Sequence, residues 1–160
     1  MSIVPAKKKL LTLCILREGD AVLLGLKKRG FGAGLWNGFG GKVEAGETIE
    51  EAARREYKEE ANIDVHGLSE RGVLTFVYED GAPTLEVHVF AAASFTGTPE
   101  ETEEMRPQWF KVAALPYDHM WADDPHWLPL FFAGKHFHGE FLFRGENTLL
   151  SHTLIELRAA

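Results

Sequence analysis

Only one segment of this chain, residues 49–61, carries a strong helical pattern, and most of the other apolar segments are strand-like. Its apolar residues recur at the spacing of one helix face. Thr48 followed by Glu51 is typical of a capping box at a helix start. Asn62 at the far end tolerates the left-handed conformation with which many helices stop. This helix must therefore pack on a sheet built from the strands around it.

Strand-like segments occur on both sides of that helix. We expect strands at residues 10–17, 21–27, 74–79, 85–93, 108–112, 137–143 and 148–157. Asp124-Pro125 predicts the start of a second helix with Asp124 as its N-cap, although Pro129 weakens that pattern. The sequence therefore predicts one α+β domain over residues 1–160, with a mixed or antiparallel β-sheet packed between helices. Residues 134–160 are expected to form a hairpin, to which the sequence assigns no role beyond packing.

Composition excludes several classes of protein. Apolar residues make up 45% of the chain, which is enough for a folded core. With 17 basic and 24 acidic residues the net charge is −7, which argues against binding a nucleic-acid polymer but not a single nucleotide. No apolar run approaches the roughly 18 residues of a membrane span. The lone Cys14 favours a reducing compartment, so we expect a cytoplasmic protein, with a nuclear or mitochondrial fraction left open.

Three carboxylates lie on or beside the apolar side of the helix. At roughly 100° per residue, Glu56, Glu59 and Glu60 fall near the direction of the apolar residues and can converge on one point. Burying an unpaired carboxylate costs on the order of several kcal/mol, so these groups need a nearby positive charge. One candidate is a basic side chain, and Arg55 is the nearest. The other is a divalent cation, and oxygen donors without Cys or His favour Mg²⁺ or Mn²⁺ over zinc.

The residues from 41 to 63 also follow a spaced pattern of glycine, glutamate and arginine. Its fixed positions are filled by Gly41, Glu47, Arg55, Glu56, Glu59, Glu60 and Ile63. This segment resembles the Nudix box of the Nudix hydrolases, G-x5-E-x7-R-E-U-x-E-E-x-G-U, in which U is a bulky aliphatic residue. Tyr57 replaces an aliphatic residue and Asn62 replaces the last glycine, two mild departures. The resemblance implies the Nudix fold, in which a mixed sheet lies between helices as an α/β/α sandwich.

Stretches outside the box resemble one branch of that family. Residues 27–34, 36–43, 104–107 and 120–124 are similar to segments of the MutT homologues that act on oxidised purine nucleoside triphosphates, and the likeness runs from about Leu10 to Leu157. It implies a monomeric, Mg²⁺-dependent enzyme, with Mn²⁺ as a substitute. This enzyme would hydrolyse 8-oxo-dGTP, 2-hydroxy-dATP and related nucleotides to the monophosphate and pyrophosphate. Such an activity removes damaged nucleotides from the pool used for DNA synthesis and repair.

The same resemblance implies which residues form the site. It assigns catalysis and metal binding to Gly40, Glu56, Glu59, Glu60 and Glu104. It places the nucleotide near Lys27, Phe39, Gly40, Gly41 and Lys42. The base pocket would be lined by Thr12, Asn37, Trp121, Ala122, Asp123 and Asp124, with Phe31, Phe76 and Trp127 as apolar walls. For each aromatic residue taken alone, ordinary core packing is the alternative.

The pair Asp123-Asp124 suggests how a base could be recognised. Two close carboxylates in a dry pocket cannot both ionise cheaply, so one pKa rises and that group can donate a hydrogen bond. A proton that moves between the two would let one pocket accept guanine-like and adenine-like edges, with Asn37 adding an amide. A solvated pair or a helix cap is the alternative for such a dipeptide.

Other functions stay open from the sequence. The chain could be a Nudix enzyme for ADP-ribose, dinucleoside polyphosphates or an mRNA cap, a nucleotide-binding module without catalysis, or an acidic structural domain. The intact glutamates of the box argue against a module that has lost catalysis. The general base is undecided between Glu60, acting through the metal, and Glu104. The basic run at residues 27–29 could attract a triphosphate despite the acidic net charge.

Overall fold

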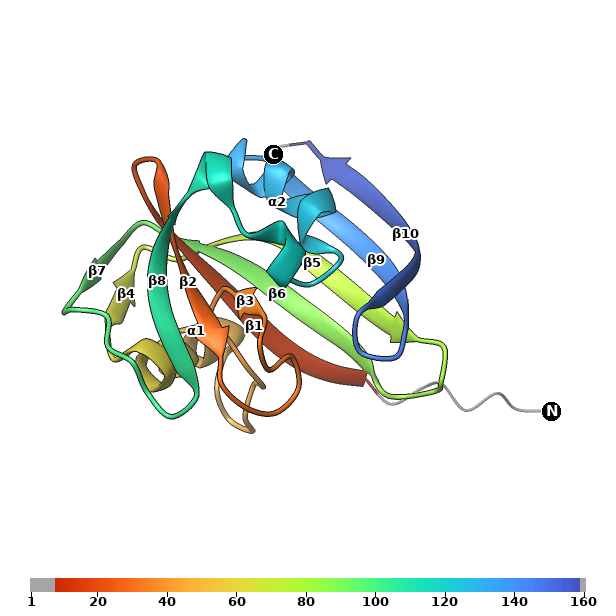
Figure 1. The fold of residues 1–160 in the computed structure, drawn as a ribbon, viewed down its shortest axis with the longest axis horizontal. Helices are drawn as coiled ribbons and strands as arrows, with labels where there is room; N and C mark the ends of the chain where they lie inside the picture. Colours follow the sequence, from red (N-terminus) through yellow and green to blue (C-terminus); the bar gives the residue numbers. More distant parts are fainter. Residues whose placement is uncertain (1–7, 159–160) are drawn as a thin grey trace.

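The computed structural model describes residues 8–158, so the first seven and last two residues of the expected domain lie outside it. Its centre is a mixed eight-stranded sheet in the order β10-β9-β5-β6-β1-β2-β3, with β8 also paired to β2 (Figure 1). The strands are β1 (Lys8–Glu18), β2 (Ala21–Lys27), β3 (Trp36–Asn37), β5 (Ser69–Tyr78), β6 (Thr84–Ala92), β8 (Met105–Lys111), β9 (His136–Arg144) and β10 (Thr148–Leu157). The pairs β1–β6 and β5–β9 are parallel, and the other pairs are antiparallel.

Smaller elements complete the chain. The short strands β4 (Asp64–His66) and β7 (Ser94–Thr96) form a separate antiparallel pair. Two α-helices, α1 (Ile49–Ala61) and α2 (Asp124–Phe132), and two 3-10 turns, η1 (Val112–Ala114) and η2 (Tyr117–His119), lie between the strands. Neither helix within residues 8–158 is long and apolar enough to cross a membrane.

Helix α1 has the bounds that the sequence predicts. The Thr48 hydroxyl accepts a hydrogen bond from the Glu51 amide, and the Glu51 carboxylate accepts one from the Thr48 amide, both at 3.1 Å. Asn62 ends the helix in the left-handed conformation, with φ of 58°. Both ends of the helix therefore satisfy their backbone groups locally, which fixes where its side chains point.

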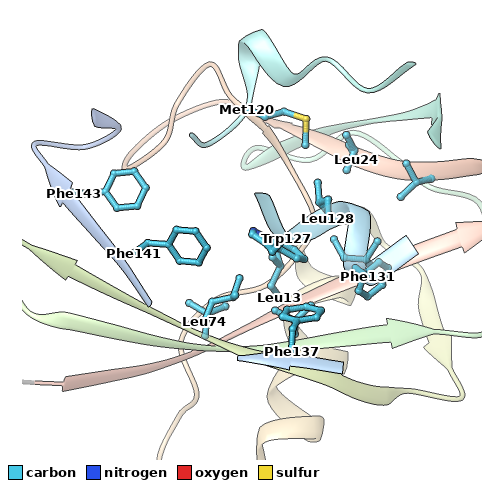
Figure 2. Close-up of a cluster of buried hydrophobic side chains, with 14 residues drawn as sticks. Leu13, Leu24, Leu74, Met120, Trp127, Leu128, Phe131, Phe137, Phe141 and Phe143 are labelled. Atoms are coloured by element: carbon cyan, nitrogen blue, oxygen red, sulfur yellow. The ribbon is translucent and has the colours of Figure 1, made fainter. Parts of the chain in front are cut away.

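The two helices cover opposite faces of the sheet, which confirms the α/β/α sandwich. Because side chains alternate along a strand, β1 sends Cys14 and Leu16 into the core beneath α1, and Leu13 and Ile15 into the other core. That second core is rich in aromatic residues. Figure 2 shows the α2 side chains, among them Trp127, packed over residues of the sheet.

Several sequence-based boundaries differ from the structure. β5 begins at Ser69 rather than residue 74, because it pairs with β6 across a bulge between Glu70 and Gly72 and continues the sheet. The strands β3, β4 and β7 were not predicted, since two or three residues carry too little periodicity. The prediction that Asp124 is an N-cap is wrong. Asp124 is the first residue of α2, and neither it nor Asp123 caps the helix because both side chains are buried.

Candidate functional site

A cavity of about 710 Å³ lies between the sheet, the glycine-rich loop and the start of α2. It gathers residues that are distant in sequence, from β1, the loop of residues 30–41, the end of α1, β5, and the β9–β10 turn. Most residues expected at the site line it: Thr12, Lys27, Phe31, Asn37, Gly40, Gly41, Lys42, Glu60, Phe76, Trp121, Asp123, Asp124 and Trp127. Its volume is within the range of sites that hold a small-molecule ligand.

Two expected substrate contacts lie outside the cavity lining. Phe39 is fully buried in the core beneath α1, where its ring lies 4.4 Å from that of Tyr57. The reason is strand-like alternation along the loop, which directs Gly38 and Gly40 to the cavity and the side chain between them to the opposite face. Ala122 is half-buried, and its amide donates to a side chain of the β9–β10 turn.

The glycine-rich loop runs against β1 with almost no space between them. Backbone bridges join Cys14 to Phe39 and Leu11 to Lys42. A Cβ atom on Gly40 would overlap the backbone carbonyl of Thr12, and one on Gly41 would come within 2.5 Å of the Glu56 carboxyl carbon. Glycine is therefore required at position 40, whereas a side chain at position 41 would displace the Glu56 carboxylate. The loop backbone forms one wall of the cavity beside Glu60 of α1.

Glu60 is the buried carboxylate of α1. It is 7% exposed, and one of its oxygens accepts a hydrogen bond of 2.9 Å from the Gly40 amide. Burial raises the pKa of Glu60 to about 8, and the nearby charge of Glu56 acts in the same direction. This carboxylate lines the cavity and has no ion pair with a basic side chain of residues 8–158. A cation that entered the cavity would stabilise its charged form.

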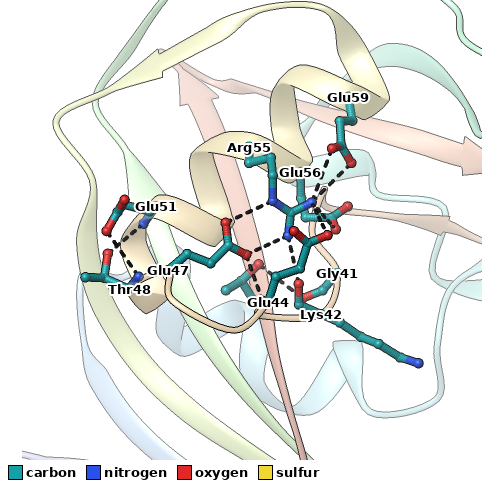
Figure 3. A network of polar contacts seen from close by, with 10 residues as sticks. Gly41, Lys42, Glu44, Glu47, Thr48, Glu51, Arg55, Glu56 and Glu59 are labelled. Carbon is teal, nitrogen blue, oxygen red and sulfur yellow. Dashed lines mark hydrogen bonds and ion pairs between the residues drawn. The ribbon is translucent and has the colours of Figure 1, made fainter.

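Glu56 and Glu59 are held differently, by the guanidinium of Arg55. Arg55 lies 3.0 Å from Glu56 and 3.2 Å from Glu59. The same side chain also donates to Glu47 at 2.7 Å and to the Lys42 carbonyl at 2.9 Å (Figure 3). The ion-pair alternative therefore holds for two of the three glutamates. Glu60 is the exception.

The donor set at this end of the cavity fits a hard divalent cation by its chemistry. Glu56, with a side chain 17% exposed, has its pKa raised mainly by burial, and Glu59 adds to that effect. Their carboxylate oxygens are the hard donors that Mg²⁺ prefers. Within residues 8–158, however, no three acidic, histidine or cysteine side chains are arranged as a ready metal centre. The side chains of Glu56 and Glu59 would have to leave Arg55 to complete one.

Glu104, expected at the metal, lies near this group but outside the cavity lining. Its carboxylate accepts hydrogen bonds of 2.6 and 3.1 Å from Arg29, which hold its pKa below the usual range. Its charge still raises the pKa of Glu60. Glu104 is thus within electrostatic reach of the cavity, and Arg29 neutralises it in this conformation.

The far end of the cavity holds a second pair of acids, in a dry setting. Asp123 and Asp124 are 3% and 2% exposed, and the Trp127 indole donates to Asp123 at 2.8 Å. One Asp124 oxygen is buried without a hydrogen-bond partner in the described part of the chain. Burial raises the pKa of both carboxyls, and the charge of Asp123 raises that of Asp124 further. Burial therefore favours the protonated, uncharged form of these two carboxyls.

Aromatic side chains form the mouth and walls beside this pair. The rings of Phe31 and Trp121 lie 4.9 Å apart with an interplanar angle of 33°. Phe31 is 50% exposed, so part of its ring is free to contact a ligand at the mouth of the cavity. Phe76 packs deeper, 5.7 Å from Phe141. A flat ring that enters the cavity would meet aromatic surface and an acidic edge together.

Sequence reasoning missed several lining residues. The β5–β6 turn contributes Asp80, Ala82 and Pro83, and the β9–β10 turn contributes Gly145 and Glu146. The alternation of β5 could have indicated Tyr78, which is two residues beyond Phe76 on the same face. No local signal could have found the turn residues, because their place at the cavity depends on how distant strands pair.

Comparisons with known proteins agree with this arrangement. The family model described as the NUDIX domain matches residues 8–131. The chain is similar to the oxidized purine nucleoside triphosphate hydrolase of zebrafish, at 49% identity over 93% of this chain and 96% of that protein. It is 47% identical to the mouse protein of the same name, over the same shares of the two chains. A solved structure, the mutator MutT protein of Bacillus halodurans, matches with a TM-score of 0.81 and 29% identity, over 91% of this chain and 97% of that one.

Proposed function

The chain belongs to the Nudix family, and on that premise we propose that it hydrolyses oxidised purine nucleoside triphosphates to the monophosphate and pyrophosphate. The relatives named for this activity share about half of their residues with the chain over nearly its whole length. Such an enzyme removes damaged nucleotides from the pool used for DNA synthesis.

One observation carries the proposal. A single cavity joins a carboxylate of the Nudix helix, Glu60, to the buried pair Asp123 and Asp124. A nucleoside triphosphate also has two chemically different ends, with charged phosphates at one end and a flat hydrogen-bonding base at the other. The cavity also holds Lys27 and Lys42, whose charges attract the phosphates in an otherwise acidic protein.

Nudix hydrolases generally need a divalent metal such as Mg²⁺. In this chain Glu56, Glu59 and Glu60 would hold it, with the Gly40 carbonyl and Glu104 as further donors. When bound, the ion neutralises phosphate oxygens and lowers the pKa of a water molecule. Arg55 forms ion pairs with Glu56 and Glu59 and holds both side chains close to their place on the helix. The Gly40 amide orients Glu60 in the same way.

The aspartate pair would read the base. An ionised carboxylate only accepts hydrogen bonds, whereas a protonated one also donates. Because burial raises the pKa of both Asp123 and Asp124, one proton stays on the pair at neutral pH. The oxidised base can present a donor or an acceptor at the same edge, and the proton moves to the carboxyl that complements it. Asn37, also in the lining, supplies an amide with both kinds of group.

A product assay tests this proposal. We expect monophosphate and pyrophosphate from 8-oxo-dGTP and 2-hydroxy-dATP with Mg²⁺, at a higher kcat/KM than from dGTP and dATP. Activity should be lost in EDTA and return with Mg²⁺ or Mn²⁺. Release of orthophosphate and a diphosphate would show that a different bond is broken. Preference for ADP-ribose or a dinucleoside polyphosphate would assign the chain to another Nudix activity.

The setting of the activity is part of the proposal. The lone Cys14 is fully buried, which suits a reducing compartment such as the cytoplasm. We propose that the protein acts as a monomer. Light scattering of the purified protein measures the oligomeric state directly.

A further inference from the structure

The turn between β9 and β10 contacts the cavity from a part of the chain with no assigned role. The Glu146 carboxylate accepts a hydrogen bond of 2.9 Å from the Gly32 amide. The neighbouring Asn147 accepts one of 2.8 Å from the Ala122 amide through its side-chain oxygen. Its amide nitrogen donates to the Met120 carbonyl at 3.4 Å. One turn thus holds two loops that lie about 90 residues apart in sequence.

Those two loops carry the aromatic mouth of the cavity. Phe31 directly precedes Gly32, and Trp121 directly precedes Ala122. The two rings are 4.9 Å apart. Because Phe31 is half exposed, burial does little to fix its position. The hydrogen bonds to the loop backbones therefore matter more here than they would for a core residue.

The backbone conformation of the loop that contains Gly32 makes its position dependent on hydrogen bonds from outside the loop. Gly32 has φ of 85°, and a Cβ atom there would lie 2.6 Å from the Trp121 ring. Gly30 and Gly34 also have positive φ. A loop with three such glycines loses much conformational entropy when it is ordered, so outside contacts are needed to keep it in one place.

The turn itself is well anchored. β9 and β10 pair along almost their whole length, and β9 pairs in parallel with β5 inside the sheet. Gly145 of the same turn also lines the cavity. Hydrogen bonds from a turn anchored in this way transmit the rigidity of the sheet to the two loops.

We propose that Glu146 and Asn147 are positioning residues of the base pocket, which fix the places of the Phe31 and Trp121 rings at its mouth and so the space left beside them for a flat purine. This inference rests on the proposed function for its substrate. Neither residue is assigned a part in bond cleavage, because the α1 carboxylates are at the other end of the cavity. The pair gives the β9–β10 hairpin a functional role in addition to packing.

Amide hydrogen exchange of the free protein tests, without any substrate, whether the hydrogen bonds of Glu146 and Asn147 hold the two loops in place. Glu146→Ala should raise exchange at the Gly32 amide, and Asn147→Ala at the Ala122 amide, each by about tenfold, the loss expected when one hydrogen bond is removed. Glu146→Gln keeps the accepting oxygen and should stay near the wild-type rate. Glu140→Ala, an exposed change on β9, is the matched control. Unchanged exchange in both alanine variants overturns the inference.

Steady-state kinetics test the consequence. In the double variant, with both residues changed to alanine, KM for 8-oxo-dGTP should rise about tenfold while kcat stays within about twofold. Glu146→Gln, with Asn147 intact, should restore a KM close to wild type. Faster exchange with an unchanged KM overturns the positioning role. If the wild-type protein hydrolyses no modified purine nucleotide, the proposed function fails. The exchange rates alone then support or overturn the role of Glu146 and Asn147 in holding the two loops.

Discussion

The carboxyl groups at the two ends of the cavity are stabilised in different ways. At the α1 end, Glu56 and Glu59 are partly exposed and their charge is balanced by Arg55. At the α2 end, Asp123 and Asp124 are buried, and within residues 8–158 neither has an ion pair with a basic side chain. Burial raises the pKa of both carboxyls, which favours their uncharged form. The same carboxyl group therefore lies in two different electrostatic settings, paired with Arg55 at the α1 end and buried without such a partner in the described residues at the α2 end.

Glu60 shares features with both groups of carboxylates. It belongs to the α1 helix but is buried like the aspartates, and its pKa is raised to about 8. In the metal-free protein it is therefore largely protonated at neutral pH. A divalent cation would displace that proton, so metal binding at Glu60 should become tighter as pH rises.

The largest expected effect comes from removing this charge. Glu60→Gln keeps the oxygen that accepts from the Gly40 amide, so the variant should fold, but it cannot present a carboxylate to a cation. We expect kcat for 8-oxo-dGTP to fall by at least about 100-fold. Glu140→Gln on β9 serves as the control. Substantial residual Mg²⁺-dependent turnover in a folded Glu60→Gln variant would contradict the metal assignment.

A change at the other end should affect substrate choice more than turnover. Asp123→Asn keeps the size of the side chain but cannot exchange a proton with Asp124. We expect kcat/KM for 8-oxo-dGTP to fall by about 10- to 100-fold, with a smaller change for unmodified dGTP. A melting curve should show that the fold is kept. Equal rates for variant and wild type would exclude the proton-sharing pair.

The smallest effect is a pH dependence of stability in the metal-free protein. Because the folded-state pKa of Glu60 lies above its unfolded value of 4.5, the folded state binds more protons between pH about 4.5 and 8. Its stabilising contribution is complete below that window and is lost as pH rises through it. The melting temperature in EDTA should therefore fall by a few degrees from pH 5 to 8.5.

Two variants sharpen that measurement. Glu60→Gln should flatten the slope, because it removes the titrating group. Glu59→Gln, at a side chain that is 56% exposed, should leave the slope close to that of the wild-type protein. Identical slopes in all three proteins would mean that Glu60 is not the buried acid responsible.

The sequence predicted the parts of the molecule that rest on local chemistry. The capping box at Thr48 and the left-handed Asn62 fixed the ends of α1, and alternation gave most strands of the sheet. Prediction from the sequence failed where burial of a side chain outweighed a local sequence signal. Asp124 resembles an N-cap in sequence, but its side chain is buried in the lining of the cavity instead.

In the candidate site, too, some features follow from local sequence and others depend on distant contacts. The resemblance to the MutT homologues assigned Glu60 and Gly40 to the metal site, and the structure brings the two residues to within hydrogen-bond distance. The side chain of Phe39, in the same run, faces the opposite core because its neighbours take the cavity side. Glu146 reaches the cavity only through the long-range pairing of β9 with β5, which no local pattern encodes.

The most direct test is a crystal structure with Mg²⁺ and an 8-oxo-purine nucleoside monophosphate. We expect Mg²⁺ on Glu56, Glu59 and Glu60, with Glu56 and Glu59 moved away from Arg55, and the base edge hydrogen-bonded to Asp123 and Asp124. If Arg55 still holds both glutamates, Mg²⁺ is absent at saturating concentration and the base lies elsewhere, then the cavity does not join a metal site to a base pocket.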